Sequence, residues 1–366
     1  MKKIILVLIG LSHYTLLGVC AQSEPCTTPV GHPGLCVPVQ YCRNIYGIIQ
    51  SKKRPSEGIL NYIRKSVCRL AGVSKSVCCQ LTEVDKAVTS MPPNKPVLPM
   101  NCGTTTADRV AYGLQTGVFE YPWMALLRFR DFNQDLVDGC GGTLIHERYV
   151  LTAAHCLHDR KLILDHVRLG EHNKITDIDC EGEDGDCAGP VQDVRVETTI
   201  IHPMYNNPKF RNDIGLIRLE RNVIFDDQIK PICLPITKEF SSILHSKYIL
   251  TGWGTTENNS LSNVLLKAYL PRIENEQCEH IMKSNSLEVE LSEHQFCAGG
   301  RDLKDSCRGD SGGPLGTVGL LHNEPRFIQF GIVSIGVNSC GLKNIPSIYT
   351  RVGLYMDWII ENMKPS

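Results

Sequence analysis

The stretch that decides the fold is Asp305-Ser306-Cys307-Arg308-Gly309-Asp310-Ser311-Gly312-Gly313-Pro314. It places Ser311 between an aspartate and two glycines, and glycine reaches backbone conformations that are closed to other residues. The backbone N–H groups of Gly309 and Ser311 can therefore point at one developing oxyanion. A serine hydroxyl alone is a weak nucleophile, so a base and an orienting acid must lie elsewhere in the chain.

Two other stretches supply these groups. Leu151-Thr152-Ala153-Ala154-His155-Cys156 offers a base, and Asn212-Asp213-Ile214-Gly215-Leu216 offers an acid. We expect Ser311 to attack a carbonyl, His155 to take its proton, and Asp213 to hold the imidazole tautomer. Taken singly, each could be structural: a core histidine, a turn aspartate or a loop hydroxyl. Three motifs in the order His, Asp, Ser favour the catalytic interpretation.

With these motifs in this order, the segment from about Arg109 to Trp358 resembles a trypsin-like serine protease. The resemblance implies an all-β, chymotrypsin-like fold of two six-stranded barrels with the triad at their junction, followed by a C-terminal helix. The residues themselves favour strands in alternating runs such as 194–197 and 326–333. Helical spacing near the C-terminus is carried by Val352, Tyr355, Met356, Ile359 and Ile360.

The chain of 366 residues suggests two domains or one large domain, and its formal charge of −1 gives no attraction toward nucleic acid or an anionic membrane. Residues 1–21 combine Lys2-Lys3, an apolar run and a small-residue exit, which predicts a signal peptide cleaved after Ala21. The alternative is a membrane anchor, which His13 disfavours by interrupting an already short apolar run. We therefore expect a secreted protein with no membrane or nucleic-acid partner.

The cysteine count supports an oxidising compartment. Removal of Cys20 with the signal peptide leaves 16 of the 17 cysteines, which predicts eight disulfides. A zinc site is disfavoured because no paired CxxC or HExxH motif accompanies the cysteines.

Residues 22–79 form the first predicted domain of the mature chain. About 55 residues with six cysteines need disulfides to fold, and the residues alone allow fifteen connectivities. The adjacent pair Cys78-Cys79, after what we interpret as irregular loop, resembles the clip domain that precedes proteases of arthropod haemolymph. The resemblance implies the pairs Cys26–Cys78, Cys36–Cys68 and Cys42–Cys79. The basic patch at 51–54 is interpreted as a solvated loop, with a docking surface or a nick site as the alternative.

Residues 80–109 form a proline-rich linker that ends at an activation junction, and residues 110–366 form the predicted protease domain. The family's Ile-Val-Gly-Gly is degraded here to Val110-Ala111-Tyr112-Gly113. The resemblance implies an inactive zymogen, cut after Arg109 by an upstream trypsin-like protease. The new amine of Val110 would then pair with the buried carboxylate of Asp310. The alternative is that Arg109 is an ordinary exposed loop residue.

The remaining ten cysteines find partners under the same resemblance. It implies that Cys140–Cys156 closes the loop of His155 and that Cys278–Cys297 and Cys307–Cys340 brace the specificity pocket. It also implies that Cys102–Cys233 tethers the clip domain after cleavage and that Cys180–Cys187 forms a short local loop.

The resemblance also implies a substrate pocket. Asp305 occupies the position at the base of the S1 pocket, where a carboxylate selects Arg or Lys. Gly336 matches the glycine of one wall, but Ser347 stands where the family keeps a second glycine. Ile335 replaces the usual aromatic residue after Val333-Ser334. We expect these departures to alter the size of the pocket and not the reaction.

An acidic loop follows Leu169. The resemblance implies a calcium site there, with side chains of Glu171 and Asp179 and carbonyls of Asn173 and Thr176 as ligands. A solvated acidic loop is the alternative. Asn258-Asn259-Ser260 is a glycosylation sequon.

The whole chain is similar to arthropod clip-domain serine proteases. The similarity implies an extracellular enzyme of haemolymph-like fluid that cuts after basic residues in an immune or developmental cascade, as in prophenoloxidase activation or Toll-ligand processing. It implies a downstream zymogen or cytokine precursor as substrate, serpins as inhibitors and no catalytic cofactor. The alternatives are a digestive trypsin, or a weakly active homologue that acts as a binding cofactor.

Overall fold

The computed structural model describes residues 24–51, 55–70, 73–84, 98–104, 115–158, 162–182, 185–256, 260–300, 306, 308–321, 324–335 and 345–364. Seven residues with predicted roles lie outside these ranges: Arg109, Val110, Asn258, Asp305, Cys307, Gly336 and Cys340. The signal peptide and the basic residues 52–54 also lie outside them. The chain divides into two compact units, one ending at Lys95 and the other beginning at Pro96.

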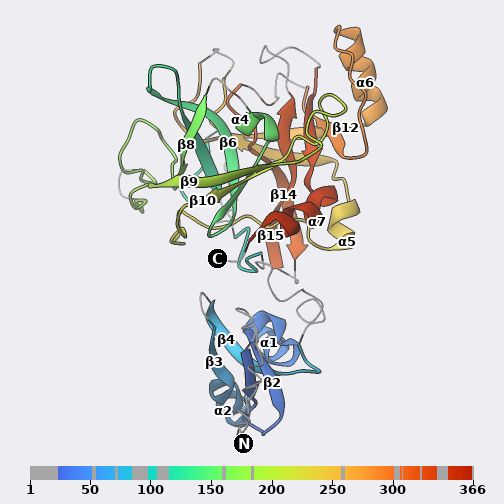
Figure 1. Ribbon diagram of the computed structural model, residues 1–366. Helices are drawn as coiled ribbons and strands as arrows, with labels where there is room; N and C mark the ends of the chain where they lie inside the picture. Colours follow the sequence, from blue (N-terminus) through green and yellow to red (C-terminus); the bar gives the residue numbers. More distant parts are fainter. Residues whose placement is uncertain are drawn as a thin grey trace, which may run out of the picture. The chain divides into compact units, whose positions relative to one another are not determined.

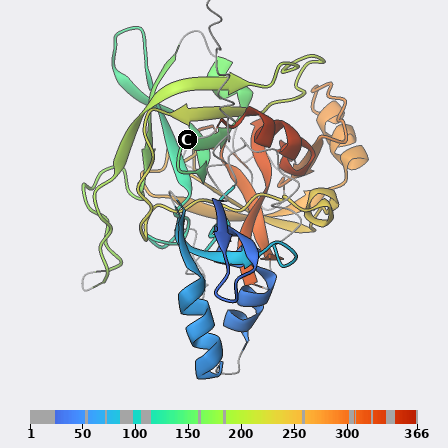
Figure 2. The same cartoon turned by 60° about the horizontal axis from the view of Figure 1, so that its bottom comes forward.

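The smaller unit is a four-stranded antiparallel sheet with two helices (Figures 1 and 2). The strand order is β1-β2-β4-β3, and three disulfides hold the unit: Cys26–Cys78, Cys36–Cys68 and Cys42–Cys79. These are the pairs that the resemblance implies. The elements are β1 (Glu24–Thr27), β2 (Pro33–Pro38), η1 (Val39–Tyr41), α1 (Arg43–Gln50), α2 (Glu57–Ser66), β3 (Val67–Leu70) and β4 (Val73–Gln80).

The prediction of an irregular loop before Cys78-Cys79 is wrong. Helix α2 and strands β3 and β4 occupy that stretch. The helix carries Glu57 in its first turn and Arg64 and Lys65 in its last, and these charges complement the helix dipole. Cysteine spacing was the signal used for this unit, and it carries no information on the conformation between the cysteines.

The larger unit contains two closed six-stranded antiparallel barrels, as the resemblance implies. The order in the first barrel is β10-β7-β6-β5-β8-β9. Its strands are β5 (Met124–Arg130), β6 (Leu136–His146), β7 (Tyr149–Thr152), β8 (Ile163–Leu169), β9 (Gln192–Ile201) and β10 (Gly215–Leu219). The short helix α4 (Ala154–His158) follows β7 directly.

The second barrel has the order β11-β12-β13-β16-β15-β14. Its strands are β11 (Lys247–Gly252), β12 (Leu266–Ile273), β13 (Gln295–Ala298), β14 (Pro314–Leu321), β15 (Glu324–Ile335) and β16 (Ser347–Arg351). The helices of this half are α5 (Lys238–Ser242), α6 (Asn275–Ser284), η2 (Val352–Tyr355) and α7 (Met356–Asn362). Among the described residues, no helix combines the length and the apolar character that crossing a bilayer requires.

The predicted C-terminal helix is present, and it links the two barrels. It begins only after β16, because residues 347–351 complete the second barrel as a strand. The buried side chains of Ile359 and Met363 then join the main apolar core, which is built mostly from the first barrel. The hydroxyl of Tyr149 in β7 accepts a hydrogen bond from the backbone N–H of Lys364 (2.7 Å). Burial of these apolar side chains stabilises the contact between the barrels.

A short segment before the first barrel is attached to the second. A disulfide joins Cys102 to Cys233, the N–H of Gly103 donates to the carbonyl of Pro231 (2.8 Å), and the N–H of Phe327 donates to the carbonyl of Gly103 (2.9 Å). The segment therefore behaves as part of the larger unit and is held by both covalent and hydrogen bonds.

Candidate active site

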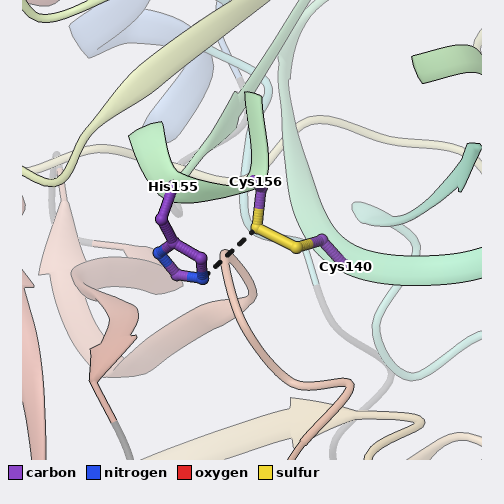
Figure 3. A group of neighbouring side chains, drawn as sticks. All are labelled: Cys140, His155 and Cys156. Carbon is purple, nitrogen blue, oxygen red and sulfur yellow. Dashed lines mark hydrogen bonds between the residues drawn. A yellow bond between two sulfur atoms is a disulfide. The ribbon is translucent and has the colours of Figure 1, made fainter. Parts of the chain in front are cut away.

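His155 lies on helix α4, beside a disulfide (Figure 3). Cys156 on the same helix is joined to Cys140 of β6, which ties the helix to the first barrel. The Nε2 atom of His155 lies 3.7 Å from Cys156 Sγ. Although Cys140, His155 and Cys156 lie close enough to hold a metal ion, both sulfurs belong to the disulfide, so no thiolate is available as a ligand.

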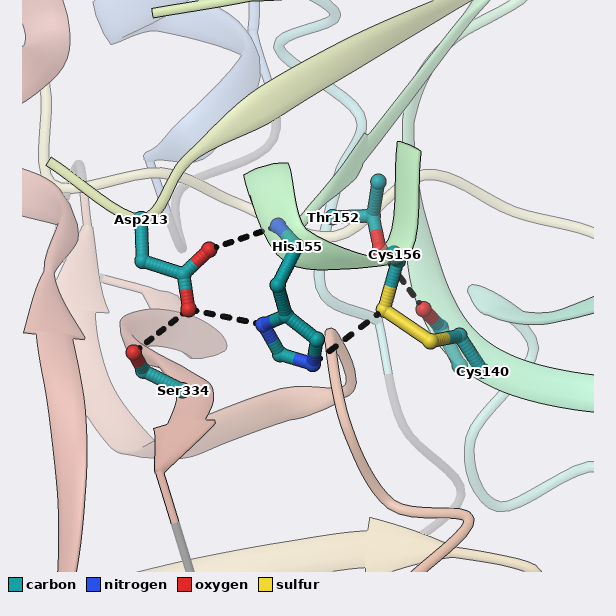
Figure 4. Close-up of a disulfide and its surroundings, with 7 residues drawn as sticks. Cys140, Thr152, His155, Cys156, Asp213 and Ser334 are labelled. Atoms are coloured by element: carbon teal, nitrogen blue, oxygen red, sulfur yellow. Dashed lines mark hydrogen bonds and ion pairs between the residues drawn. A yellow bond between two sulfur atoms is a disulfide. The ribbon is translucent and has the colours of Figure 1, made fainter. Parts of the chain in front are cut away.

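Asp213, which precedes β10, orients the ring of His155 (Figure 4). Its carboxylate accepts the Nδ1–H of His155 (2.8 Å) on one oxygen and the backbone N–H of His155 (2.9 Å) on the other. Only 5% of the Asp213 side chain is exposed. Because Nδ1 carries the proton, Nε2 is left as the basic nitrogen, which is the tautomer a general base requires.

Ser334 is a site residue that our sequence reasoning missed. Its hydroxyl, at the end of β15, donates to the Asp213 Oδ2 atom (2.5 Å) (Figure 4). Thr350 of β16 donates to the Asp213 backbone carbonyl (2.8 Å). The sequence signal that could have indicated its role is a polar residue, Ser334 itself, inside the apolar run 330–335. Two strands of the second barrel thus hold an acid supplied by the first.

The pKa of the His155 ring is raised above its ordinary value of 6.5. Burial alone lowers this pKa, because it disfavours the charged ring. The hydrogen bond to Asp213 and the negative charge of Asp213 outweigh burial. The arrangement therefore stabilises the imidazolium that forms when the ring takes a proton.

Ser311 is presented by a loop that lies directly against β6. The carbonyl of Ser311 accepts the N–H of Gly141 (2.8 Å), and the N–H of Gly312 donates to the carbonyl of Val333 (2.9 Å). Gly312 has φ +77°, and a Cβ added there would lie 2.2 Å from the hydroxyl of Thr152. Only glycine combines this conformation with this approach, so the second residue of Ser311-Gly312-Gly313 is required by the contact between the barrels.

The residues proposed for the oxyanion hole lie in the same loop. The carbonyl of Arg308 accepts the N–H (2.8 Å) and the hydroxyl (2.9 Å) of Thr255. In a trans peptide the N–H points opposite to the carbonyl, so the N–H of Gly309 points away from Thr255. Within the described part of the chain, no hydrogen bond joins Ser311 to the ring of His155. Such bonds are often long before a substrate is bound.

Asp310 is buried next to the nucleophile. The N–H of Gly254 donates to Asp310 Oδ1 (2.9 Å), and a Cβ at Gly254 would lie 2.3 Å from Oδ2. The absence of a side chain at Gly254 therefore creates the space for this carboxylate. Its expected partner, the amine of Val110, lies outside the described residues.

Comparison with known proteins identifies the family. A model described as Trypsin matches residues 113–359, and one described as Regulatory CLIP domain of proteinases matches residues 26–79. Serine protease grass of Drosophila melanogaster is 38% identical over 377 residues, covering 98% of this chain and 97% of that protein. The chain belongs to the clip-domain serine proteases. Its enzymatic class is therefore that of the trypsin-like serine endopeptidases.

Two further relatives extend across nearly the whole chain. Phenoloxidase-activating factor 1 of Holotrichia diomphalia is 36% identical over 380 residues and covers 100% of both proteins. The crystal structure of the Drosophila Grass clip serine protease of the Toll pathway aligns with a TM-score of 0.65 and 38% identity, over 94% of this chain and 100% of that one.

In this clip-domain serine protease, the structure describes only part of the predicted S1 pocket. Asp305 and Gly336 lie outside the described residues. Ser347, at the start of β16, is fully buried, and its hydroxyl has no hydrogen-bond partner in the part of the chain that the structure describes. The disulfide Cys278–Cys297 is present, whereas Cys307 and Cys340 lie outside the described part of the chain.

Hydrogen bonds join residues 172–179 of the acidic loop in the clip-domain protease. Asp179 accepts the N–H groups of His172 (3.2 Å) and Asn173 (3.0 Å) on one oxygen and the hydroxyl of Thr176 on the other. The carbonyl of Asn173 accepts the N–H (3.0 Å) and the hydroxyl (3.1 Å) of Thr176. Two of the predicted calcium ligands, the Asp179 carboxylate and the Asn173 carbonyl, are thus engaged within the loop. A disulfide joins Cys180 to Cys187.

Glu171 differs from these residues. Its Oε2 atom forms an ion pair with Arg168 (3.3 Å). Its Oε1 atom and the side-chain oxygen of Asn173 are buried, and neither has a hydrogen-bond partner among the described residues. Burial raises the pKa of the Glu171 carboxyl, although the charge of Arg168 opposes this. Carboxylate and amide oxygens such as these two are the ligands that a hard cation such as calcium prefers.

Replacement of Asp213 by Asn tests the electrostatics of the site. The amide keeps the size but removes the charge, so burial should dominate and the pKa of His155 should fall below 6.5. In the activated protein we expect kcat to fall by about 10⁴-fold, because the amide also favours the wrong tautomer. For the wild type, kcat/KM should decline as pH drops through a pKa above 6.5, since only the neutral ring accepts a proton.

The measurement is an NMR titration of the His155 ring, in Ser311→Ala proteins with and without Asp213→Asn, together with a pH–rate profile. An identical His155 pKa in both proteins would contradict the assignment of Asp213 as the source of the raised pKa.

Proposed function

We propose that the chain is the zymogen of an active protease, which cleavage after Arg109 converts into an enzyme that hydrolyses peptide bonds after Arg or Lys. One observation carries the proposal: the buried Asp213 carboxylate holds the ring of His155 in the tautomer of a general base. A purely binding homologue has no need to keep a charged group buried at this position, because burial of a charge costs free energy.

The reaction follows from the positions of these groups. Ser311 Oγ attacks the carbonyl carbon of the scissile bond, and His155 Nε2 takes the hydroxyl proton. The tetrahedral intermediate places its negative charge near the N–H groups of Gly309 and Ser311. His155 then donates the proton to the leaving amine, which breaks the C–N bond and leaves an acyl group on Ser311. Water, deprotonated by the same ring, then attacks the acyl carbon. The ester bond breaks, the ring returns the proton to Ser311 Oγ, and the acyl group leaves as a carboxylic acid.

Activation depends on Asp310. The free amine of Val110 would pair with the Asp310 carboxylate in its buried position beside Gly254. The new ion pair can reorganise the neighbouring Arg308–Gly309 peptide, since a buried ion pair, once formed, costs about 3–5 kcal/mol to break. The chemistry itself needs no cofactor, because the nucleophile, base and oxyanion donors are all protein groups.

The names of its relatives support a place in an extracellular cascade. One relative is a phenoloxidase-activating factor, and another is a clip serine protease of the Toll pathway. We place this chain, secreted through its signal peptide, in an immune or developmental cascade of that kind. Its partners would be an upstream trypsin-like activator, a downstream zymogen or cytokine precursor, and serpin inhibitors. A regulatory clip unit argues against a digestive role.

We propose that the acidic loop holds a structural calcium ion. Glu171 Oε1 and the side-chain oxygen of Asn173 would be its first ligands, because both are buried without partners among the described residues. Asp179 and Thr176 shape the loop around them through the hydrogen bonds described above. The ion would neutralise the buried Glu171 carboxylate and thereby stabilise the loop.

Selective cleavage tests the proposed activation. Wild-type zymogen treated with a trypsin-like protease should gain amidase activity, with Val110 as the new N-terminus. Arg109→Ala should remain inactive, and Ser311→Ala should be cleaved but stay inactive. Activity is read from chromogenic Arg peptides, and the cut is located by N-terminal sequencing. A wild-type protein that is cleaved after Arg109 and still hydrolyses nothing would instead favour the inactive binding homologue.

A kinetic series tests the pocket. Activated wild type should cut Arg and Lys peptides and spare Phe peptides, and Asp305→Ser should lose this preference. Ser347→Gly should raise kcat/KM for Arg and Lys peptides by about tenfold, roughly 1.4 kcal/mol, because it removes a buried hydroxymethyl group from a narrow slot. If Ser347→Gly leaves both values unchanged, Ser347 does not face the substrate.

Calcium linkage tests the acidic loop. Millimolar calcium should raise the Tm of the wild-type protein, because a ligand of the native state stabilises it by mass action. Glu171→Gln removes the charged ligand and should abolish the increase, while Glu220→Gln, an exposed site outside the loop, should keep it. Equal melting curves in calcium and in chelator would show that the loop is merely solvated.

A further inference from the structure

The residue before the catalytic aspartate has an unusual backbone. Asn212 has φ +57°, in the left-handed region that costs most L-residues roughly 1–2 kcal/mol. Asn is one of the few side chains that tolerate this region, because it can form hydrogen bonds locally. The N–H of Ile214 donates to the Asn212 carbonyl (2.9 Å), so the chain turns tightly around Asp213. The direction of the Asp213 side chain therefore depends on the conformation of Asn212.

Two hydrogen bonds hold the Asn212 side chain. Its Nδ2 donates to the carbonyl of Met204 (2.8 Å), and its Oδ1 accepts the hydroxyl of Tyr355 (2.9 Å). The first bond is local, whereas the second crosses from η2 at the far end of the chain. Tyr355 is the only described partner of the Asn212 side chain that comes from beyond the second barrel.

The ring of Tyr355 is fixed in place. It is 4% exposed and packs against two histidine rings, with ring centroids 5.5 Å from that of His202 and 5.2 Å from that of His294. Burial raises the pKa of the Tyr355 hydroxyl, and the negative charge of Asp213 raises it further. The hydroxyl therefore stays protonated across the working range of the enzyme and remains a hydrogen-bond donor.

We propose that Tyr355 is a positioning residue for catalysis: its hydroxyl holds Asn212 in the left-handed conformation that directs the Asp213 carboxylate at His155. The inference rests on the proposed function, because it assigns a role within the reaction of that site. Tyr355 touches neither the substrate nor the reacting atoms. Small misplacements of a catalytic group lower the reaction rate, so loss of this one hydroxyl should slow the attack by Ser311.

The test is Tyr355→Phe in the activated enzyme, which removes one oxygen and keeps the ring. We expect kcat to fall about tenfold with KM unchanged, because the pocket is not altered. We also expect the pKa of the acid limb of kcat/KM to fall, since a misdirected Asp213 supports the imidazolium of His155 less well. The titratable groups around Tyr355 are His202, His294 and Asp213. All three are retained in both proteins.

Two comparisons separate positioning from a general loss of stability. Tyr248→Phe removes another buried hydroxyl, which accepts the N–H of His245 (2.9 Å) inside the second barrel. It should lower the Tm and leave kcat and the pH profile unchanged. Asn212→Gly keeps the left-handed backbone but removes the side chain that Tyr355 holds. The double variant Tyr355→Phe/Asn212→Gly should lose no more kcat than Asn212→Gly alone.

Additive losses in the double variant, or a Tyr355→Phe enzyme with wild-type kcat and pH profile, would overturn the proposal. NMR titration of His155 in uncleaved Ser311→Ala zymogen, with and without Tyr355→Phe, needs no turnover. A lowered His155 pKa in Tyr355→Phe supports the positioning role even if the wild-type protein proves inactive, and an unchanged pKa overturns it. Failure of the proposed function is read separately, from the absence of wild-type activity.

Discussion

The buried carboxylate of Asp213 sets the constraint on which the larger unit depends. Removal of a charge from water is costly unless hydrogen bonds replace the lost solvation. Here His155 supplies two donors from the first barrel, and Ser334 supplies a third from the second. Since neither barrel alone can satisfy this group, the carboxylate fixes how the barrels meet, and that junction is where the nucleophile lies.

Close approach of backbone to backbone is the second requirement at this junction. The loop of Ser311 lies against Gly141 of β6, and the Asp310 carboxylate lies against Gly254 after β11. At Gly254 the absence of a side chain makes room for the Asp310 carboxylate, and a Cβ at Gly141 would lie 3.3 Å from the Cα atom of Gly313. Gly141 and Gly254 are thus explained by what they contact.

The sequence predicted the catalytic residues because each lies in a short motif that the chemistry requires. His155, Asp213 and Ser311 each lie in a short recognisable stretch, and alternating residues predicted strands in both barrels. Ser334 and Tyr355 escaped prediction as site residues, because their hydrogen bonds to Asp213 and Asn212 join positions 121 and 143 residues apart. Neither has a spacing that signals such a contact. Helix α2 and strands β3 and β4 of the clip unit were missed because cysteine spacing constrains cross-links and not the path between them.

The disulfide between Cys102 and Cys233 has a consequence for the product of activation. A cut after Arg109 would divide the polypeptide and still leave one molecule, because the bond joins positions on either side of the cut. The clip unit would then stay covalently attached to the protease unit, however dilute the fluid. To a target that contacts both units, the cleaved protein would be a bivalent binder. It would therefore bind that target more tightly than either unit alone.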